Sequence, residues 1–288
     1  MKQPHQASRG RSVRRLALSL ALAMAAGLGA TTTPPARAGV IPVGPIAASV
    51  TGQGSYGTIK GRLVYGDTQA PPAKDLVAKG QATKDPAVCA AAEAIPDRSL
   101  QIDPKTLGVA NGFAYLVRPK GENPDAVKAL VSKSPMVEVD QKNCEFIPYS
   151  VAIHQDQIVQ YKSSDPVNHN VHLSPFTNPP FNQILAPNGS EKKKFVPERR
   201  PIPLTCDIHP WMKGWLMIFD HPFFDVTGPD GSFEIKGVPA GEQKIVVWQE
   251  LVGYATPGLA QGTPVVVKAG EVTDIGDVKL DPSKIRRR

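Results

Sequence analysis

Four residues of metal-binding type occur in a distinctive order in the second half of the chain. His169 is followed 37 residues later by Cys206, and His209 and Met212 then come at steps of three residues. Two imidazole nitrogens and a thiolate in a roughly trigonal plane, with a weak thioether on the axis, form a type 1 (blue) copper site. Neither Cu(I) nor Cu(II) would ideally choose this geometry, so electron exchange costs little. The order therefore predicts one copper ion held by these four residues.

Each of these residues has a more ordinary interpretation when it is taken alone. A single His is more often a surface or hydrogen-bonded residue than a ligand, and a lone Met or Cys is more often part of the core. Only their joint order and spacing favours a metal site. His172 lies three residues after His169. Because side chains alternate between the two faces of a strand, we expect His172 to point away from the metal.

Zinc is the competing metal, since His169, His172, Cys206 and His209 would supply a tetrahedral set of nitrogen and sulfur donors. That set requires both His169 and His172 to converge on one point. Covalent haem attachment needs Cys-x-x-Cys-His, and the segment from Cys206 to His209 lacks the second Cys. A single type 1 site leaves no open position for a substrate, and no Ser/His/Asp set or paired carboxylate cluster is identifiable. We therefore expect the protein not to be an enzyme.

The elements that would position these residues are predicted to be β-strands. Short stretches rich in β-branched and aromatic residues are separated by Pro, Gly, Asn and Asp, which is typical of an all-β fold. These stretches are residues 58–65, 112–117, 136–139, 150–153 and 158–162. Residues 86–94 and 124–132 instead have Ala, Leu, Val and Lys at helical spacing after a proline, so they are predicted to be short helices on the sheet.

A second small β-unit is predicted after His221. Asp230 and Gly231 form a tight turn between two strand candidates within residues 224–235. The same turn-then-strand pattern is repeated over residues 238–248, and residues 263–268 and 271–280 provide two more strands.

Two motifs of this chain resemble the copper-binding motifs of the cupredoxins, most closely those of the amicyanin type. They are DPVNHNVH over residues 165–172 and CDIHPWMKG over residues 206–214. The resemblance covers about residues 136–222 and implies a Greek-key sandwich with His169, Cys206, His209 and Met212 as ligands. The chain departs from the family just before the Cys, where PIPLT over residues 201–205 replaces a Tyr-x-Tyr or Phe-x-Tyr strand.

The same resemblance assigns roles to residues around the ligands. Asn170 would hydrogen-bond near the thiolate and stiffen the site. His209 would reach the surface through an apolar patch that includes Pro210 and Trp211, where a redox partner docks. The near-neutral charge of the mature chain argues against strong long-range steering of that partner, so a c-type cytochrome or a periplasmic dehydrogenase would fit equally.

The run DGSFEIKGVPAG over residues 230–241 resembles the transthyretin-like, carboxypeptidase-regulatory type of β-sandwich module. Such modules commonly open with a strand like residues 57–65, so the N-terminal segment is expected to complete the C-terminal unit, with the copper domain inserted between them. The predicted organisation is a signal peptide (1–38), a linker (39–55), an N-terminal β segment with short helices (56–135), a cupredoxin domain (136–222), a carboxypeptidase-regulatory-like module (223–282) and a basic tail (283–288).

The N-terminus has the pattern of a signal peptide. Basic residues precede an apolar run over residues 16–30, and Ala36-Arg37-Ala38 offers a cleavage site after Ala38. Arg14 and Arg15 suggest twin-arginine export, but the residues around them fit that pattern only loosely, so we expect export by the general secretory route. No segment is long and apolar enough to be favoured as a membrane span. The leader holds six basic and no acidic residues, so its removal lowers the net charge from +7 to +1. The remaining basic clusters lack interleaved aromatics, which argues against nucleic-acid binding.

Three cysteines in an exported chain leave one unpaired. Cys206 lies among potential metal ligands, whereas Cys89 and Cys144 have no His or Met within a few residues. We therefore predict a disulfide between Cys89 and Cys144, with two buried thiols as the alternative.

These observations favour a periplasmic or secreted type 1 copper protein that passes single electrons between redox partners. A copper storage or delivery protein is a second hypothesis, but it predicts more spare Met and His around the site than this chain has. A third is a β-sandwich binding module whose metal site is only structural, which the transthyretin-like segment suggests.

Overall fold

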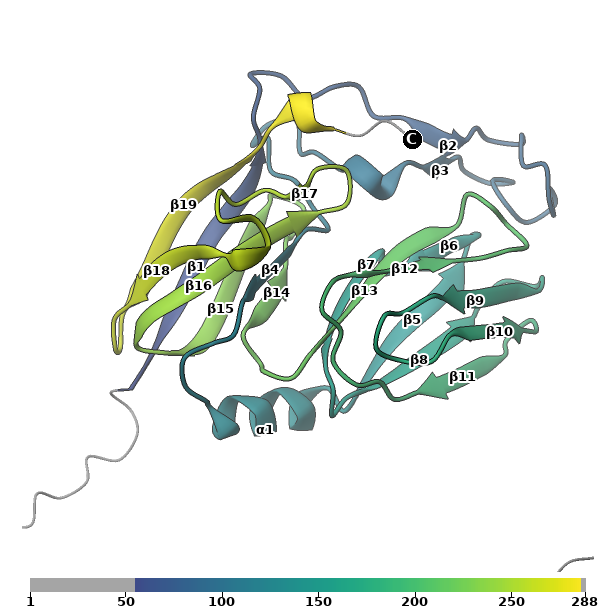
Figure 1. The fold of residues 1–288 in the computed structure, drawn as a ribbon. Coiled ribbons are helices and arrows are strands. Elements are labelled where there is room, and N and C mark those ends of the chain that lie inside the picture. Colours follow the sequence, from purple (N-terminus) through teal and green to yellow (C-terminus); the bar gives the residue numbers. More distant parts are fainter. Residues whose placement is uncertain (1–54, 286–288) are drawn as a thin grey trace, which may run out of the picture. The chain divides into compact units, whose positions relative to one another are not determined.

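A computed structural model describes residues 55–285, and the regular elements of this part of the chain are nearly all β-strands (Figure 1). The predicted signal peptide, residues 39–54 of the predicted linker and the last three residues of the basic tail lie outside the described residues. One α-helix, α1 (Pro124–Lys133), and three short 3-10 helices, η1 (Arg98–Leu100), η2 (Leu259–Gln261) and η3 (Pro282–Lys284), accompany the strands in residues 55–285. In this range we find no helix with the length and apolar character needed to cross a membrane.

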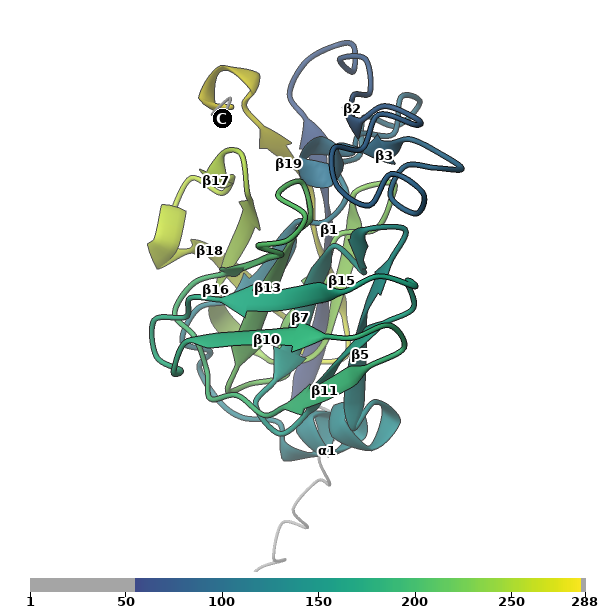
Figure 2. The same ribbon diagram turned by 90° about the vertical axis from the view of Figure 1, so that its right-hand side faces the viewer.

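The middle of the chain forms a two-sheet sandwich, which we call the site sandwich. One sheet has the strand order β10-β9-β12-β13-β7 and the other has the order β11-β8-β5-β6, and all of these strands are labelled in Figure 1. Figure 2 shows the same part of the chain after a quarter turn. Non-consecutive strands are neighbours in both sheets, as in a Greek-key sandwich. The strands are β5 (Met136–Lys142), β6 (Glu145–Ile147), β7 (Ser150–His154), β8 (Ile158–Ser163), β9 (His169–Leu173), β10 (Phe181–Leu185), β11 (Ser190–Lys193), β12 (Ile202–Thr205) and β13 (Lys213–Phe219).

Alternation of side chains builds the core of the site sandwich. In β8, Val159, Tyr161 and Ser163 are buried while the residues between them are more accessible. This period of two is what a strand with one covered face requires. The apolar members of this face pack with residues of the facing sheet, including Val171, Leu173 and Leu204, in one core cluster.

Strands from both ends of the chain form a second sandwich, the terminal sandwich. β1 lies between β15, to which it is antiparallel, and β19, to which it is parallel. The other sheet has the order β14-β4-β16-β17, with β18 paired to β16. The site sandwich is thus inserted in sequence between β4 and β14. The strands are β1 (Tyr56–Tyr65), β4 (Phe113–Leu116), β14 (Phe224–Val226), β15 (Ser232–Pro239), β16 (Gly241–Gln249), β17 (Gly253–Tyr254), β18 (Thr263–Val267) and β19 (Val272–Leu280).

Aromatic side chains of both sandwiches share a third buried cluster. Trp215 of β13 meets Trp248 of β16 edge-on, with ring centroids 4.9 Å apart. Tyr115 of β4 meets Phe219 of β13 at 5.2 Å. The outer face of the sheet that contains β13 and the outer face of the sheet that contains β4 and β16 therefore bury large rings against each other.

The prediction of a helix over residues 86–94 is wrong. The N–H groups of Val88 and Cys89 donate to the carbonyl of Asp85, which makes a single turn. Ala90 then adopts a left-handed conformation with φ +52°, which an α-helix cannot contain. These turns belong to a segment that we call the capping segment, residues 75–96, which begins with β2 (Asp75–Val77) and ends with β3 (Ile95–Pro96).

The other predicted elements are present. The helix expected over 124–132 is α1, whose first turn is capped by the Asn123 side chain, which accepts from the Ala126 N–H. The five early strand predictions correspond to β1, β4, β5, β7 and β8. The Asp230-Gly231 turn also forms, with Gly231 at φ +78°. However, the strands on either side of it, β14 and β15, enter different sheets and do not form a hairpin.

Candidate metal centre

Strand β9 places His169 in the interior of the site sandwich. His169, Val171 and Leu173 alternate with residues that face the other way, and all three are fully buried. His169 is the first residue of the strand and pairs with Leu185 of β10. Its imidazole therefore lies at the end of the sheet, next to the loop that follows β12.

The loop of residues 206–212, which we call the ligand loop, joins β12 to β13 and holds the other three predicted ligands. Thr205 pairs with Lys213 just before and after the loop, so its two ends are fixed. The Met212 N–H donates to the His209 carbonyl at 2.9 Å, which closes a tight turn. Four of the unusual residues 201–205 still form a strand, β12, and its pairing with β9 brings Cys206 beside the strand that carries His169.

Three of the predicted ligand atoms converge. His169 Nδ1 lies 3.0 Å from His209 Nδ1, and Cys206 Sγ lies 3.8 Å from the same His209 nitrogen. The ligand atoms of these three residues are all within 4.8 Å of one another. A usual metal–imidazole distance is about 2.0 Å, so two nitrogens that bind the same ion lie roughly 3 Å apart. The geometry of the two imidazoles and the thiol therefore fits one shared metal ion.

Met212, the fourth predicted ligand, is buried at the end of the ligand loop. Its side chain is only 2% exposed, and it belongs to the same core cluster as Cys206. A buried thioether at the end of the loop that carries Cys206 and His209 is of the donor type that occupies the axial position of a type 1 copper site.

His172 lies apart from this convergent set. Its Nδ1 is 2.8 Å from Asp207 Oδ1, and its ring is partly exposed. Among residues 55–285, the clusters of potential ligand atoms include His169, Cys206 and His209 but not His172. The tetrahedral zinc set therefore lacks its fourth donor.

Asn170 ties β9 to the ligand loop. Its backbone N–H points to Cys206 Sγ at 3.4 Å, and its Oδ1 accepts from the Asp207 N–H at 2.7 Å. Its Nδ2 donates to Asp207 Oδ2 at 3.0 Å and to Asn182 Oδ1 at 2.8 Å. The residue thus contacts the sulfur and fixes the residue that follows it, which is the role that the sequence motif implies.

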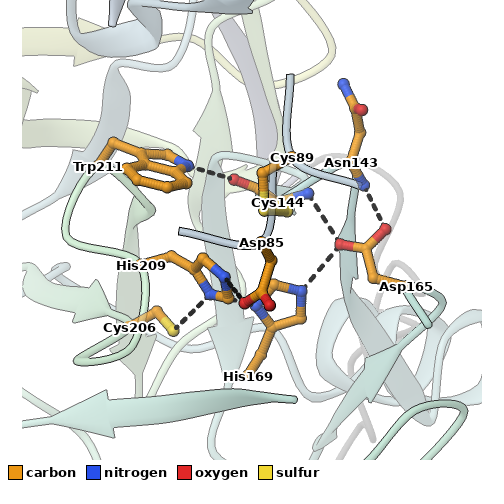
Figure 3. The surroundings of a disulfide bond; sticks show 9 residues. All are labelled: Asp85, Cys89, Asn143, Cys144, Asp165, His169, Cys206, His209 and Trp211. Carbon is orange, nitrogen blue, oxygen red and sulfur yellow. Dashed lines mark hydrogen bonds and ion pairs between the residues drawn. A yellow bond between two sulfur atoms is a disulfide. The ribbon is translucent and has the colours of Figure 1, made fainter. Parts of the chain in front are cut away.

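Both candidate ligand histidines have a carboxylate on the outer ring nitrogen, a feature that sequence reasoning missed (Figure 3). His169 Nε2 lies 2.8 Å from Asp165 Oδ2, and His209 Nε2 lies 2.8 Å from Asp85 Oδ2. Because a carboxylate oxygen accepts, the proton of each ring lies on Nε2, and Nδ1 is directed into the site. The contact of Asp165 could have been predicted from the sequence, because Asp165 lies four positions before His169. Asp85 gives no such signal, because it is 124 positions from His209.

The predicted disulfide between Cys89 and Cys144 is present, and the alternative of two buried thiols is wrong. The two Cα atoms lie 5.3 Å apart, and both residues are fully buried. Cys206 is the free cysteine of the described residues. The disulfide sulfurs lie within 4.8 Å of a ring nitrogen of His209, so the bridge is directly beside the site.

The surroundings of Cys206 favour the thiolate. Burial alone raises the pKa of this thiol, but hydrogen bonds with His169, with His209 and with the Asn170 N–H outweigh burial and lower the pKa to about 6. Burial likewise lowers the pKa of His169, while its hydrogen bonds with Asp165 and Cys206 raise the pKa to about 9. Both shifts favour a thiolate next to an imidazolium, and a metal ion that binds here would displace a proton.

The expectation that His209 reaches the surface is wrong. Its ring is 0% exposed, because Asp85 covers the outer nitrogen and Trp211 packs beside the ring with centroids 5.4 Å apart. The two residues predicted to form a docking patch do lie nearer to solvent: Pro210 is exposed and Trp211 is partly exposed. The Trp211 indole N–H donates to the Cys144 carbonyl at 3.3 Å, so this ring is fixed in place.

Comparison with known proteins gives structural similarity to copper proteins only over part of the chain. No protein-family model matches the sequence, and no curated protein sequence matches it. The copper-containing nitrite reductase of Thermus scotoductus SA-01 is 22% identical, with a TM-score of 0.27, and the match covers 29% of this chain and 22% of the reductase. A Cu(I) amicyanin variant is 16% identical with a TM-score of 0.27, and a reduced amicyanin variant is 17% identical with a TM-score of 0.27. Each amicyanin match covers 37% of this chain and 98% of amicyanin, so this chain spans nearly all of the length of amicyanin but about a fifth of the reductase.

Proposed function

We propose that this chain is an exported type 1 copper protein that carries single electrons between redox partners. The observation that supports the proposal most strongly is the convergence of His169 Nδ1, His209 Nδ1 and Cys206 Sγ, with Met212 buried in the same loop. Copper bound by this donor set would supply a one-electron Cu(II)/Cu(I) couple.

The protein around the site is suited to holding its ligands still. Asn170 fixes the first turn of the ligand loop, and the pairing of β12 with β13 fixes its ends. Asp165 and Asp85 set which nitrogen of each histidine faces the site. Ligands that do not move between oxidation states keep the reorganisation cost of electron exchange low, which is what a carrier requires.

The alternatives have less support. A storage or delivery protein would need further imidazole and thiolate donors near the site. In residues 55–285, the other clusters of His, Cys and carboxylate groups contain Cys89 or Cys144. Those sulfurs are bonded to each other and cannot act as thiolates. A site of purely structural zinc would need a fourth donor in place of His172, whose ring contacts Asp207.

Periplasmic or extracellular location forms part of the proposal. The predicted signal peptide supports it, and so does the disulfide between Cys89 and Cys144, because disulfides persist in oxidising compartments. We further propose that the protein is not an enzyme, since four protein donors leave no position at the metal for a substrate.

We propose that Pro210 and Trp211 contribute to docking of a redox protein such as a c-type cytochrome or a periplasmic dehydrogenase. Pro210 is exposed, and Trp211 packs against the buried ring of His209 and also reaches the surface. The transthyretin-like character of the terminal sandwich is likewise a proposal, which rests on the run of residues 230–241.

The test is a copper titration of the mature protein and of two matched variants. We expect the protein to turn intensely blue with one equivalent of Cu(II). Cys206→Ser should abolish the colour because the thiolate is lost, whereas His172→Gln should keep it. A colourless protein that retains zinc would contradict the proposal, and loss of colour in His172→Gln would overturn the choice of ligands.

A further inference from the structure

The capping segment reaches the metal site through one carboxylate. Asp85 Oδ2 lies 2.8 Å from His209 Nε2, and its side chain is 33% exposed while the imidazole is fully buried. Asp85 precedes the site sandwich by about fifty residues and belongs to neither of its sheets. The contact is therefore supplied to the ligand from outside the sandwich that builds the rest of the site.

The conformation of Asp85 is fixed by the turn that it begins. Its backbone is left-handed, with φ +46°, and its carbonyl accepts from the N–H groups of Val88 and Cys89, each at 2.9 Å. Cys89 is then joined by the disulfide to Cys144. Ala82, Cys89 and Ala90 pack in the core cluster of the site sandwich, so the turn is held by burial as well as by the covalent bond.

Cys144 connects this turn to the other ligand histidine (Figure 3). Its sulfur holds Cys89 and thereby Asp85, which contacts His209. Its backbone N–H donates to Asp165 Oδ2 at 2.8 Å, and that same oxygen contacts His169 Nε2. The outer nitrogens of both histidines are thus linked through a single residue of the turn between β5 and β6.

We propose that Asp85 is a positioning residue for His209, locked in place by the Cys89–Cys144 disulfide, and that it closes the edge of His209 that would otherwise face solvent. This inference rests on the proposed function in one respect, because it takes His209 to be a copper ligand. Asp85 itself does not touch the metal position; it acts through the ring.

Two physical effects follow from this arrangement. A carboxylate that accepts the Nε2 proton fixes the tautomer and makes the imidazole a stronger donor at Nδ1. A negative charge close to the site also favours Cu(II) over Cu(I), because the ion of higher charge gains more from it. Asp85 should therefore strengthen Cu(II) binding and lower the reduction potential of the site.

The experiment compares Asp85→Asn and Asp85→Ala with Asp156→Asn as a matched control. Asp156 is an exposed carboxylate 3.6 Å from the Nδ1 of His154, a histidine that the copper site does not use. We expect Cu(II) affinity, measured by competition with a chelator, to fall tenfold or more in both Asp85 variants. If Cu(I) affinity is unchanged, a tenfold loss raises the reduction potential by about 59 mV. Asp156→Asn should leave both quantities unchanged.

A second measurement uses the metal-free protein and so does not depend on copper. In NMR spectra, the Nε2 proton of His209 should exchange slowly with water in the wild type and rapidly in Asp85→Ala, and Asp85→Glu should partly restore protection. Unchanged affinity, potential and exchange in correctly folded Asp85 variants would overturn the proposal. If the wild type shows slow exchange but does not become blue with copper, the proposed function fails while the contact between Asp85 and His209 stands.

Discussion

At the scale of single residues, the proposed donor set can be predicted from the sequence, whereas the residues that support it can be predicted only in part. His169, Cys206, His209 and Met212 follow from residue type and spacing, because three of them share one short loop. Asn170 follows from the motif around His169. Asp85 does not, since carboxylates are common and only the folded chain brings this one to His209.

Asn170 gives the first prediction. Replacement by Ala should destabilise the metal-free protein by about 1–3 kcal/mol, because the buried Asn170 side chain is lost and the N–H of Asp207 loses its acceptor in a partly buried place. Urea denaturation of the mature protein measures this loss. Asn182→Ala is the control, because Asn182 contacts Asn170 and Asp207 from an exposed position on β10. This replacement should lower the free energy of unfolding by less than about 1 kcal/mol. Equal losses in the two variants would be inconsistent with this role of Asn170.

At the scale of elements, the sequence predicts strands well and fails at the capping segment. The strands β1, β4, β5, β7 and β8 lie in stretches rich in β-branched and aromatic residues, which fit the pleated surface of a sheet. Residues 86–94 have helical spacing, but nine residues are too few to stabilise a helix alone. The disulfide at Cys89 and the left-handed Ala90 hold the chain in turns instead.

A buried carboxylate links the loop after β9 to the segment before β12. Glu198 accepts from the backbone N–H groups of Phe176, Thr177 and Asn178, and also from the Asn178 side chain. Burial raises the pKa of Glu198, but these hydrogen bonds outweigh burial and hold the pKa below its ordinary value of 4.5. Because the pKa is lower in the folded state, the stabilisation is complete above pH 4.5 and is lost as the pH falls through the folded pKa.

Glu198→Gln should therefore cost about 1.5–3 kcal/mol at neutral pH, and this difference from the wild type should shrink in acid. Denaturation curves at a series of pH values test both parts. Glu191→Gln, on the exposed strand β11, is the control and should change stability little at any pH. A Glu198→Gln deficit that persists unchanged in acid would show that the charge of Glu198 is not the cause.

The disulfide closes a loop with a sequence separation of 55 residues. In the chain-entropy account, a loop of this length contributes about 4 kcal/mol by restricting the unfolded chain. The double variant Cys89→Ala with Cys144→Ala should lose about this amount in chemical denaturation. Addition of a reductant should destabilise the wild type and leave the double variant unchanged. A double variant as stable as the oxidised wild type would argue against a structural role of the bridge.

At the scale of the whole molecule, the insertion of one sandwich into the other is the feature that short sequence patterns predict least well. The run of residues 230–241 suggested a module that an N-terminal strand completes, and β1 does pair with β15 and β19. The shared aromatic cluster could not be foreseen, because Trp215 and Trp248 are brought together only when both sandwiches have formed.

Trp248 tests this shared cluster. Trp248→Ala should destabilise the protein by about 3–5 kcal/mol, because it removes a large buried ring that packs against Phe113 and Trp215. Val266→Ala, at an exposed position of β18 in the same sandwich, is the control and should change stability by less than about 0.5 kcal/mol. Urea denaturation of the mature protein and of both variants measures these changes. A small effect of Trp248→Ala would mean that the two sandwiches are stable without this contact.

A redox titration of the copper-loaded mature protein, followed by its visible absorption, tests whether one copper ion held by His169, Cys206, His209 and Met212 makes the molecule an electron carrier. We expect one copper and one electron per chain, with the blue colour bleached by ascorbate and fully restored by an oxidant over repeated cycles. Tight binding of a metal without a reversible one-electron couple would contradict the proposed function.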